Sequence, residues 1–351
     1  MNHNNEWNEI FPEVPQSFRD AVRHALNAQT GAEVRTPDKT RREKTMKRRF
    51  PVALVAVIAI LAVTAAAAAV IEWNAKLADR FGADEQQQNQ LVTEGAVATV
   101  DQTVTENGLT VTVLQTLGDK NGVYLLFDVK APEGIALTDT NGFESTDVSI
   151  EGTSRRVSWS GGFLSNTDES GSASGKANER YYELWLSNVG QEDWKGKKIT
   201  VSFANLQADK GKLDLYTITE GEWTLSWTLS YSDQMQTFDI NKTYNINGHE
   251  VMVKSIELSP LSMTLNLGGD GLKQLIDDSD LNQCGCLYKY SLTMQDGTTL
   301  SLMGPGSENW TDTSHTRTIC FDKVLDADRV TGLTLTFPWE DADNTLTVDL
   351  P

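Results

Sequence analysis

Cysteine and histidine are scarce in this chain of 351 residues, which contains three of the former and four of the latter. All three cysteines follow residue 283, so the chain has no disulfide framework and must rely on hydrophobic cores. Beyond residue 71 the only histidines are His249 and His315, which we interpret as surface residues rather than general bases. The sequence therefore offers few groups for acid–base or metal chemistry.

Motifs of catalysis and nucleotide binding are missing as well. No GxGxxG, phosphate loop, HExxH or EF-hand loop occurs. In the stretch Gly171–Gly175, Ala173 stands where a nucleophile elbow requires serine. The acidic run Asp277–Asp280 lacks the spaced oxygen ligands and the glycine of a calcium loop. We expect a protein that is not an enzyme and that holds no cofactor and no metal ion.

Basic residues are few and unevenly distributed. Residues 1–49 contain ten Lys and Arg against seven Asp and Glu, whereas the chain beyond Ile71 contains 20 against 42. So acidic a region repels phosphates, which excludes nucleic acid as a partner. Its charge mainly keeps an exposed domain soluble.

There is one long apolar run, from Phe50 to Ile71. The 21 residues Pro51–Ile71 carry no charge and span about 31 Å as a helix, the thickness of a bilayer core. Lys and Arg cluster just before the run and not after it, which places the N-terminus inside the cell. We predict a single-pass protein of the cell membrane with extracellular C-terminal domains. The alternative, a cleaved signal peptide, is disfavoured by the 49 residues that precede the run and by its length.

The residues after this run have the alternation of β-strands. Val97–Val104 and Leu109–Leu114 flank Asn107-Gly108, a strong hairpin signal. The Ser- and Gly-rich stretch Thr153–Arg180 is expected to be an exposed loop. A helical pattern is confined to the region around Leu272–Ile276. Further strands are predicted at Val123–Val129, Tyr181–Leu186, Lys198–Phe203, Trp223–Tyr231, Lys289–Thr293 and Leu333–Phe337.

An internal repeat organises these strands. Asp101–Val113 resembles Asn241–Val253 at a constant offset of 140 residues, and Tyr182–Phe203 resembles Thr318–Phe337. This weak duplication predicts a mainly β protein with two tandem Ig-like β-sandwich domains. The predicted parts are a cytoplasmic segment with a short amphipathic helix (1–49), a transmembrane helix (50–72), a juxtamembrane stalk that is either helical or flexible (73–95), and the two β-sandwiches (96–235 and 236–351).

The cytoplasmic segment contains one short helical pattern, which begins after a capping box at Ser17. We interpret it as a docking helix for a cytosolic partner. The alternative is a helix that lies on the membrane surface or frays. Its apolar stripe, the predicted partner-binding site, consists of Phe18, Ala21, Val22, Ala25 and Leu26.

The cysteines allow three interpretations. A disulfide to Cys320, from Cys286 of the Cys284-Gly285-Cys286 pair, is the one we favour for an extracellular domain. A metal site would need a further ligand such as His315. Reduced thiols are the third interpretation.

Three segments resemble a family of Gram-positive membrane proteins that carries the domain of unknown function 4179, followed by a second Ig-like domain of unknown function. They are Phe11–Phe18 ahead of the basic run, Val97–Val129, and Phe238–Leu267 with its Glu257–Pro260 element. The resemblance implies an anti-sigma factor whose partner is a cytosolic sigma factor of the extracytoplasmic-function type. The zinc-binding His-Cys signature of such factors is missing, because no cysteine precedes residue 284.

Topology and resemblance together predict a membrane regulatory protein that is a zinc-free anti-sigma factor. Its extracytoplasmic region is expected to sense or bind an unidentified ligand or protein. The alternative is a cell-surface adhesion or wall-binding module with a passive cytoplasmic tail.

Overall fold

The computed structural model describes residues 73–153, 157–165, 176–209, 211, 214–232, 234–278, 287–337 and 344–351. These residues belong to one compact unit, Ala65–Pro351. Within these ranges, no helix has both the length and the apolar character needed to cross a bilayer. The predicted span at 50–72 and the predicted docking helix lie outside the described residues.

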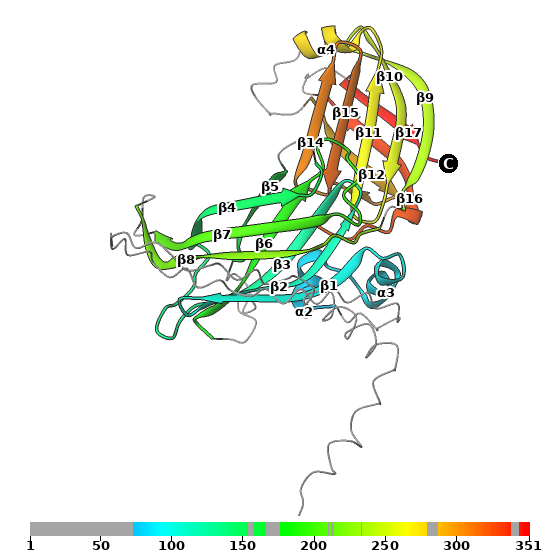
Figure 1. Cartoon of the computed structure of the whole chain (residues 1–351). Helices are drawn as coiled ribbons and strands as arrows, with labels where there is room; N and C mark the ends of the chain where they lie inside the picture. Colours follow the sequence, from blue (N-terminus) through cyan, green and yellow to red (C-terminus); the bar gives the residue numbers. More distant parts are fainter. Residues whose placement is uncertain are drawn as a thin grey trace, which may run out of the picture. The chain divides into compact units, whose positions relative to one another are not determined.

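The first β unit consists of two antiparallel sheets (Figure 1). One has the strand order β1-β2-β3-β6-β5 and the other the order β4-β7-β8. Their bounds are β1 (Val97–Glu106), β2 (Leu109–Asp119), β3 (Gly122–Lys130), β4 (Gly142–Ile150), β5 (Ser158–Phe163), β6 (Glu179–Ser187), β7 (Lys198–Asp209) and β8 (Leu215–Thr228).

A shared hydrophobic core joins these two sheets. Alternate residues of each strand point to opposite faces, so that Val111 and Phe127 of one sheet meet Phe203 of the other, each 0% exposed. Trp223 of β8 is buried in the same core and donates its indole N–H to the carbonyl of Leu109 at 3.0 Å. The buried ring thus satisfies its one polar group.

The second β unit also has two antiparallel sheets, with the orders β14-β15-β11-β10-β9 and β13-β12-β16-β17. They enclose a core of their own, which the short helix α4 (Leu272–Asp278) helps to cover with Leu272 and Leu275. The bounds are β9 (Gln236–Ile246), β10 (His249–Leu258), β11 (Ser262–Gly268), β12 (Lys289–Met294), β13 (Thr299–Leu300), β14 (Gly306–Thr311), β15 (Ser314–Cys320), a 3₁₀ helix (Ala327–Arg329), β16 (Val330–Thr336) and β17 (Thr345–Asp349).

The two β units are copies of one arrangement. In the five-stranded sheet of each unit, the first three strands are neighbours (β1-β2-β3 and β9-β10-β11). A later strand, β6 or β15, pairs with the third of them, and β5 or β14 pairs with this later strand at the edge of the sheet. The hairpin turns Asn107-Gly108 and Asn247-Gly248 both have positive φ, at 49° and 81° in the first and 50° and 85° in the second. The internal repeat inferred at an offset of 140 residues is therefore a repeat of structure.

Strand irregularities repeat at the same offset. The pairing of β2 with β3 shifts register between Val113 and Gln115, and that of β10 with its neighbours shifts between Val253 and Ser255. Bulges re-aim side chains and are reproduced in duplicated units only when the local conformation is retained. This agreement supports the duplication independently of the turns.

The mainly β class is confirmed, and each predicted strand coincides wholly or largely with an observed one. The helix expected around Leu272–Ile276 is α4. The expectation of a loop over Thr153–Arg180 is wrong in part, because strand β5 lies within it. Its Gly161 approaches β6 so closely that a Cβ would lie 2.0 Å from the carbonyl oxygen of Glu183, so a Gly-rich edge strand pairs here without the usual strand composition.

Candidate functional site

Two short helices directly follow the predicted span and begin the described part of the chain. Helix α2 (Ala75–Phe81) starts at Asn74, whose side chain accepts a hydrogen bond from the N–H of Lys76, and stops at Gly82, where φ is 58°. Helix α3 (Glu85–Thr93) starts with a reciprocal capping box between Asp84 and Gln87. Of the two forms left open for residues 73–95, the structure has the helical one.

The helices bury their apolar side chains in a cluster that we call the junction core. Phe81 lies 5.0 Å from the ring of Tyr124 and 5.4 Å from that of Trp185, both on the outer face of the first unit. Leu261 and the thiol-bearing Cys320 come from the second unit. The junction core consists of Leu77, Phe81, Leu91, Ala96, Val97, Leu117, Tyr124, Leu126, Leu164, Tyr181, Trp185, Leu261 and Cys320.

Arg80 of α2 makes polar contacts with both β units. Its Nε lies 3.0 Å from Glu183 Oε2, which also accepts the Tyr124 hydroxyl at 2.9 Å. Its Nη1 donates to the backbone carbonyl of Asp322 at 3.5 Å, and its guanidinium lies 5.6 Å from the ring centre of Trp185. Burial lowers the pKa of Arg80, but the acidic groups around it, Glu183 foremost, together offset this and raise the pKa.

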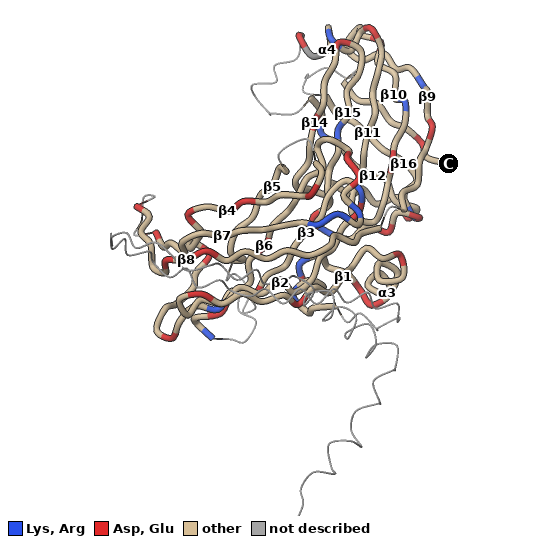
Figure 2. Tube along the Cα trace, viewed as in Figure 1, with Lys and Arg blue, Asp and Glu red and all other residues tan. Residues whose placement is uncertain are grey.

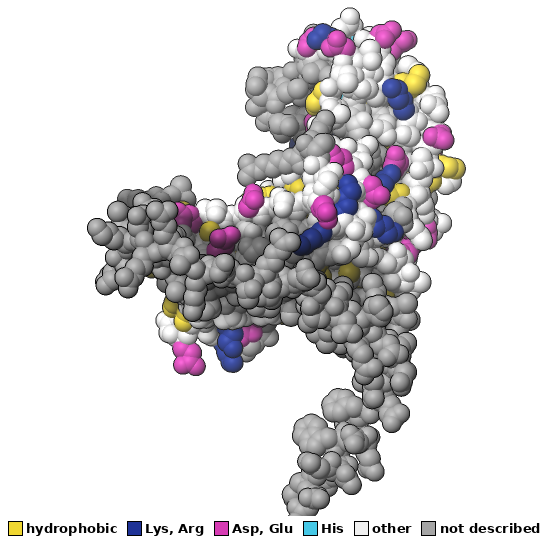
Figure 3. Space-filling view, in the orientation of Figure 1, with side chains coloured by type: hydrophobic (Ala, Val, Ile, Leu, Met, Phe, Trp, Pro, Cys, Tyr) yellow, Lys and Arg dark blue, Asp and Glu magenta, His cyan; other side chains and the backbone are white. Residues whose placement is uncertain are grey.

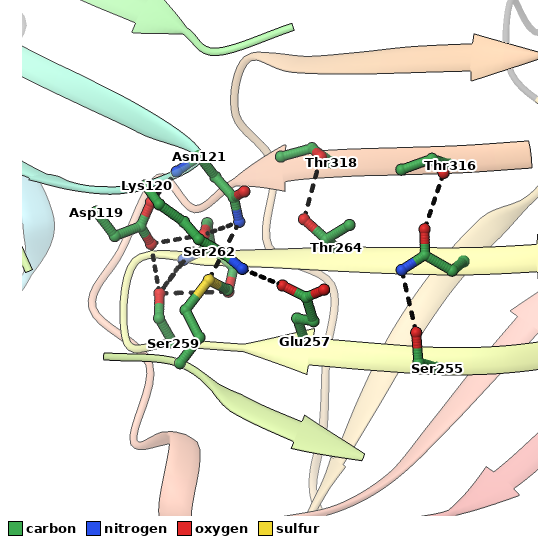
Figure 4. A network of polar contacts seen from close by, with 12 residues as sticks. Asp119, Lys120, Asn121, Ser255, Glu257, Ser259, Ser262, Thr264, Thr316 and Thr318 are labelled. Carbon is green, nitrogen blue, oxygen red and sulfur yellow. Dashed lines mark hydrogen bonds and ion pairs between the residues drawn. The ribbon is translucent and has the colours of Figure 1, made fainter. Parts of the chain in front are cut away.

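A buried polar network joins the β2–β3 turn of the first unit to the β10–β11 turn of the second (Figure 4). Asp119 Oδ2 accepts hydrogen bonds from Ser259 at 2.5 Å and Ser262 at 2.6 Å. Asn121 donates from Nδ2 to the Ser262 hydroxyl at 2.8 Å. Burial raises the pKa of Asp119, and these hydrogen bonds oppose the rise. Lys120 and Glu257 form an ion pair beside the network.

The second β unit contains a pocket of about 950 Å³, lined by strand β12 of one sheet, strands β14 and β15 of the other, and residues 301–304. This volume is at the upper end of the range for small-molecule sites. Arg80 of α2 is one of its walls, so the pocket adjoins the junction. The side chains that give it chemical character are the cations Arg80, Lys289 and Arg317, the acids Glu308 and Asp322, and the less polar Tyr288, Tyr290, Leu302, Met303 and Ile319.

The prediction that His315 lies at the surface is wrong, because its side chain is fully buried. It stacks on Trp310 with ring centres 3.6 Å apart, and its Nε2 lies 3.7 Å from Glu308 Oε2, beyond hydrogen-bonding length. Burial lowers the pKa of His315 although Glu308 opposes the shift, so we assign a neutral ring at neutral pH.

Cys320 and His315 cannot share a metal ion. They are five positions apart on β15, about 16 Å at roughly 3.3 Å per residue, and their side chains point to opposite faces. Among the described residues no group of three potential ligands is present. Cys320 is buried, and burial raises the pKa of its thiol. Cys284 and Cys286 lie outside the described residues, so the Cys286–Cys320 disulfide stays a prediction.

The partner-binding stripe predicted from the sequence also stays a prediction. Phe18, Ala21, Val22, Ala25 and Leu26 all lie outside the described residues. Sequence reasoning missed the junction core and the pocket, since both assemble from segments far apart in the chain. The capping signals of α2 and α3, visible as Asn74, Gly82 and Asp84, were the available hint for the helices.

Fold and site together define a β-rich protein with a duplicated two-sheet unit, a helical junction and a ligand-sized pocket. The family model for a domain of unknown function, DUF4179, matches residues 42–131. This match supports the family resemblance over that segment. The segment includes α2, α3 and the strands β1 to β3.

Other comparisons add little. No curated protein matches the chain. The crystal structure of a conserved domain protein from Bacillus anthracis is 12% identical, with a TM-score of 0.47, and the match covers 73% of this chain and 92% of that chain. A structure of titin is 8% identical, with a TM-score of 0.17 and a coverage of 73% and 97%. Both TM-scores are below 0.5, so neither likeness bears on fold or function.

Proposed function

We propose that the chain is a single-pass membrane regulatory protein that acts as a zinc-free anti-sigma factor. Residues 1–49 would hold a cytosolic sigma factor through the apolar stripe of the docking helix. Residues 50–72 would cross the membrane, and residues 73–351 would form an extracytoplasmic sensing region. The resemblance to a family regarded as anti-sigma factors and the distribution of basic residues support this assignment.

The observation that carries the sensing role is the burial of α2 and α3 in the junction core. The chain leaves the predicted span at residue 72, and Leu77 and Phe81 are already buried at 0% and 1% exposure. A flexible tether would isolate the span from events in the outer region. Two helices packed against both β units can instead transmit a change of conformation to the span.

We also propose that each β unit serves as the kind of binding module for which Ig-like domains are used. The strand order is not that of an immunoglobulin domain, in which strands A, B, E and D share one sheet and strand C lies in the other. Here the first three strands of each unit are neighbours in one sheet. The β units therefore resemble Ig-like domains in their two-sheet architecture and in the binding role proposed here, not in strand order.

The test is capture of a sigma factor by the cytoplasmic segment. Changing Phe18 and Leu26 together to Ala keeps helix propensity and removes two apolar contacts of about 1.5–3 kcal/mol each, so partner binding should weaken at least tenfold. A control with His24 and Asn27 changed to Ala alters the same helix away from the stripe and leaves the capping box intact. The readouts are a pull-down with residues 1–49 and expression of the regulon.

Full repression by the Phe18/Leu26 double variant, or equal loss in both variants, would contradict the docking helix. The adhesion or wall-binding module would then become the better assignment. The topology is tested separately, by adding protease to protoplasts. An N-terminal tag should survive while the β units are degraded, and loss of the tag would reverse the orientation.

A further inference from the structure

We propose that the pocket of the second β unit binds a small organic anion, in which a phosphate or carboxylate group is attached to an apolar or aromatic body. The site rests on the pocket itself, and only its part in signalling rests on the proposed function.

The charged groups of the pocket that lack partners are donors. Glu308 Oε1 already forms an ion pair with Arg317 Nε at 3.2 Å, and Asp322 Oδ1 accepts the N–H of Met303 at 3.1 Å. Arg317 directs Nη1 to the carbonyl of Tyr288 at 2.7 Å, which leaves Nη2 without a partner among the described residues. Among the described residues, no hydrogen bond or ion pair is found for the exposed ammonium of Lys289 either. A ligand that completes these contacts must bring acceptors, and an oxyanion matches the planar guanidinium best.

The rest of the wall is apolar or aromatic. The guanidinium of Arg317 lies 5.1 Å from the ring centre of Tyr288, which fixes its plane. The hydroxyl of Tyr290 donates to the carbonyl of Leu302, so its polar tip is already used. Met303 is 73% exposed at the rim, and its flexible thioether suits an apolar ligand body.

The surroundings make this site distinctive. The region beyond Ile71 contains 20 basic and 42 acidic residues, yet the pocket lining has three cations and two acids. Acidic residues are spread along the strands and turns of both β units (Figure 2). On the face shown in Figure 3, the described hydrophobic side chains are scattered among charged ones and form no large patch. Arg80 is already paired with Glu183, so attraction of an anion rests on Lys289 and on Arg317 Nη2, and the apolar wall beside them favours an amphipathic anion.

Phenyl phosphate is a suitable probe, measured by saturation-transfer NMR on the full chain in neutral detergent with empty micelles as blank. We expect saturable binding with a dissociation constant on the order of 1 mM, given the small size of the probe. Inorganic phosphate, which lacks the ring, and benzylammonium, which reverses the charge, should each bind at least roughly fivefold more weakly.

Paired variants locate the site. Lys289→Gln should weaken phenyl phosphate roughly threefold, whereas Lys198→Gln, an exposed lysine outside the pocket, should have no effect. Met303→Ser should weaken it similarly, in contrast to Leu215→Ser at a remote position that is 52% exposed. These four side chains are exposed or largely so, and the fold should not depend on them.

Three results would overturn the proposal. They are the absence of saturable binding up to roughly 10 mM, ten times the expected dissociation constant, equal binding of benzylammonium, and equal effects of the pocket variants and their controls. Binding is measured directly, so failure here would leave capture of a sigma factor by residues 1–49 unaffected, and the reverse also holds.

Discussion

Removal of the Asp119 carboxylate should loosen the contact between the two β units. Asp119 is 2% exposed, and its Oδ1 accepts the backbone N–H groups of Asn121 at 2.8 Å and Gly122 at 3.3 Å, while Oδ2 accepts the two serine hydroxyls. In Asp119→Ala all four donors lose their acceptor. The hydroxyls of Ser259 and Ser262 are 3.5 Å apart and can turn toward each other, but the amide hydrogens cannot turn.

The magnitude follows from those two amides. A buried N–H without a partner costs about 1–3 kcal/mol, so two of them set a range of roughly 2–6 kcal/mol. A water molecule in the space left by the carboxylate can satisfy one amide. We therefore expect Asp119→Ala to lower the free energy of unfolding by about 3 kcal/mol.

Asp119→Asn is the informative companion variant. Its amide oxygen can still accept from the two backbone N–H groups, and its NH₂ can donate to hydroxyls that rotate to accept. The loss should be under about 1 kcal/mol at neutral pH. Burial raises the pKa of Asp119 in the folded state, so its contribution to stability is complete below the unfolded pKa and falls as pH rises through the folded pKa. The stability of Asp119→Asn relative to the wild type should therefore increase as pH rises.

Urea unfolding of residues 73–351, followed by circular dichroism and amide exchange, measures these effects. The wild type should unfold in one transition, and Asp119→Ala should separate the transitions of the two β units. Asp147→Ala, an exposed carboxylate on β4, is the matched control and should change stability by less than about 0.5 kcal/mol. An Asp119→Ala variant as stable as this control, with a single transition, would contradict a stabilising role of the carboxylate between the β units.

Three further predictions concern the outer region. Deleting residues 73–95 removes three fully buried apolar side chains worth about 2 kcal/mol each, so residues 96–351 should melt well below residues 73–351 in a thermal scan. Burial and then the charge of Glu179 raise the pKa of Asp128 to about 7. Its contribution to the stability of the fold is therefore lost as pH rises from about 4 to 7. Asp128→Asn should thus gain stability at pH 8 and not at pH 4, and equal urea midpoints at pH 8 would contradict this. In the reduced protein, Cys320 is buried and its pKa is raised, so iodoacetamide should label it only after unfolding, and rapid labelling of the native reduced protein would contradict the buried position.

Local conformation was the part of the fold that the sequence predicted well. Asn-Gly pairs between alternating runs require positive φ at both turn positions, and the structure has it in both copies. The repeat even extends to Asp101 and Asn241, at φ of 49° and 48°, where β1 and β9 shift register against their partners. These features depend on residues close together in the chain, and so short-range sequence patterns can predict them.

The helices α2 and α3 show where such patterns stop. Helices of seven and nine residues are marginal alone, because few hydrogen bonds offset the cost of nucleation. Their capping signals indicate where a helix would begin and end, but they do not determine whether the helix forms. Stability comes from Leu77, Phe81 and Leu91, whose partners in the junction core lie up to about 240 residues away in the sequence.

The same separation explains why the pocket and its relation to the helices were beyond sequence reasoning. Arg80 is a wall of the pocket and also the ion-pair partner of Glu183, so one side chain belongs to both features. In the function proposed above, an anion in the pocket would compete with Glu183 for this guanidinium. Such competition would weaken one of the contacts that hold α2 against the first β unit. A ligand of the second unit would then act on the helix that directly follows the predicted span, without any change to the two cores.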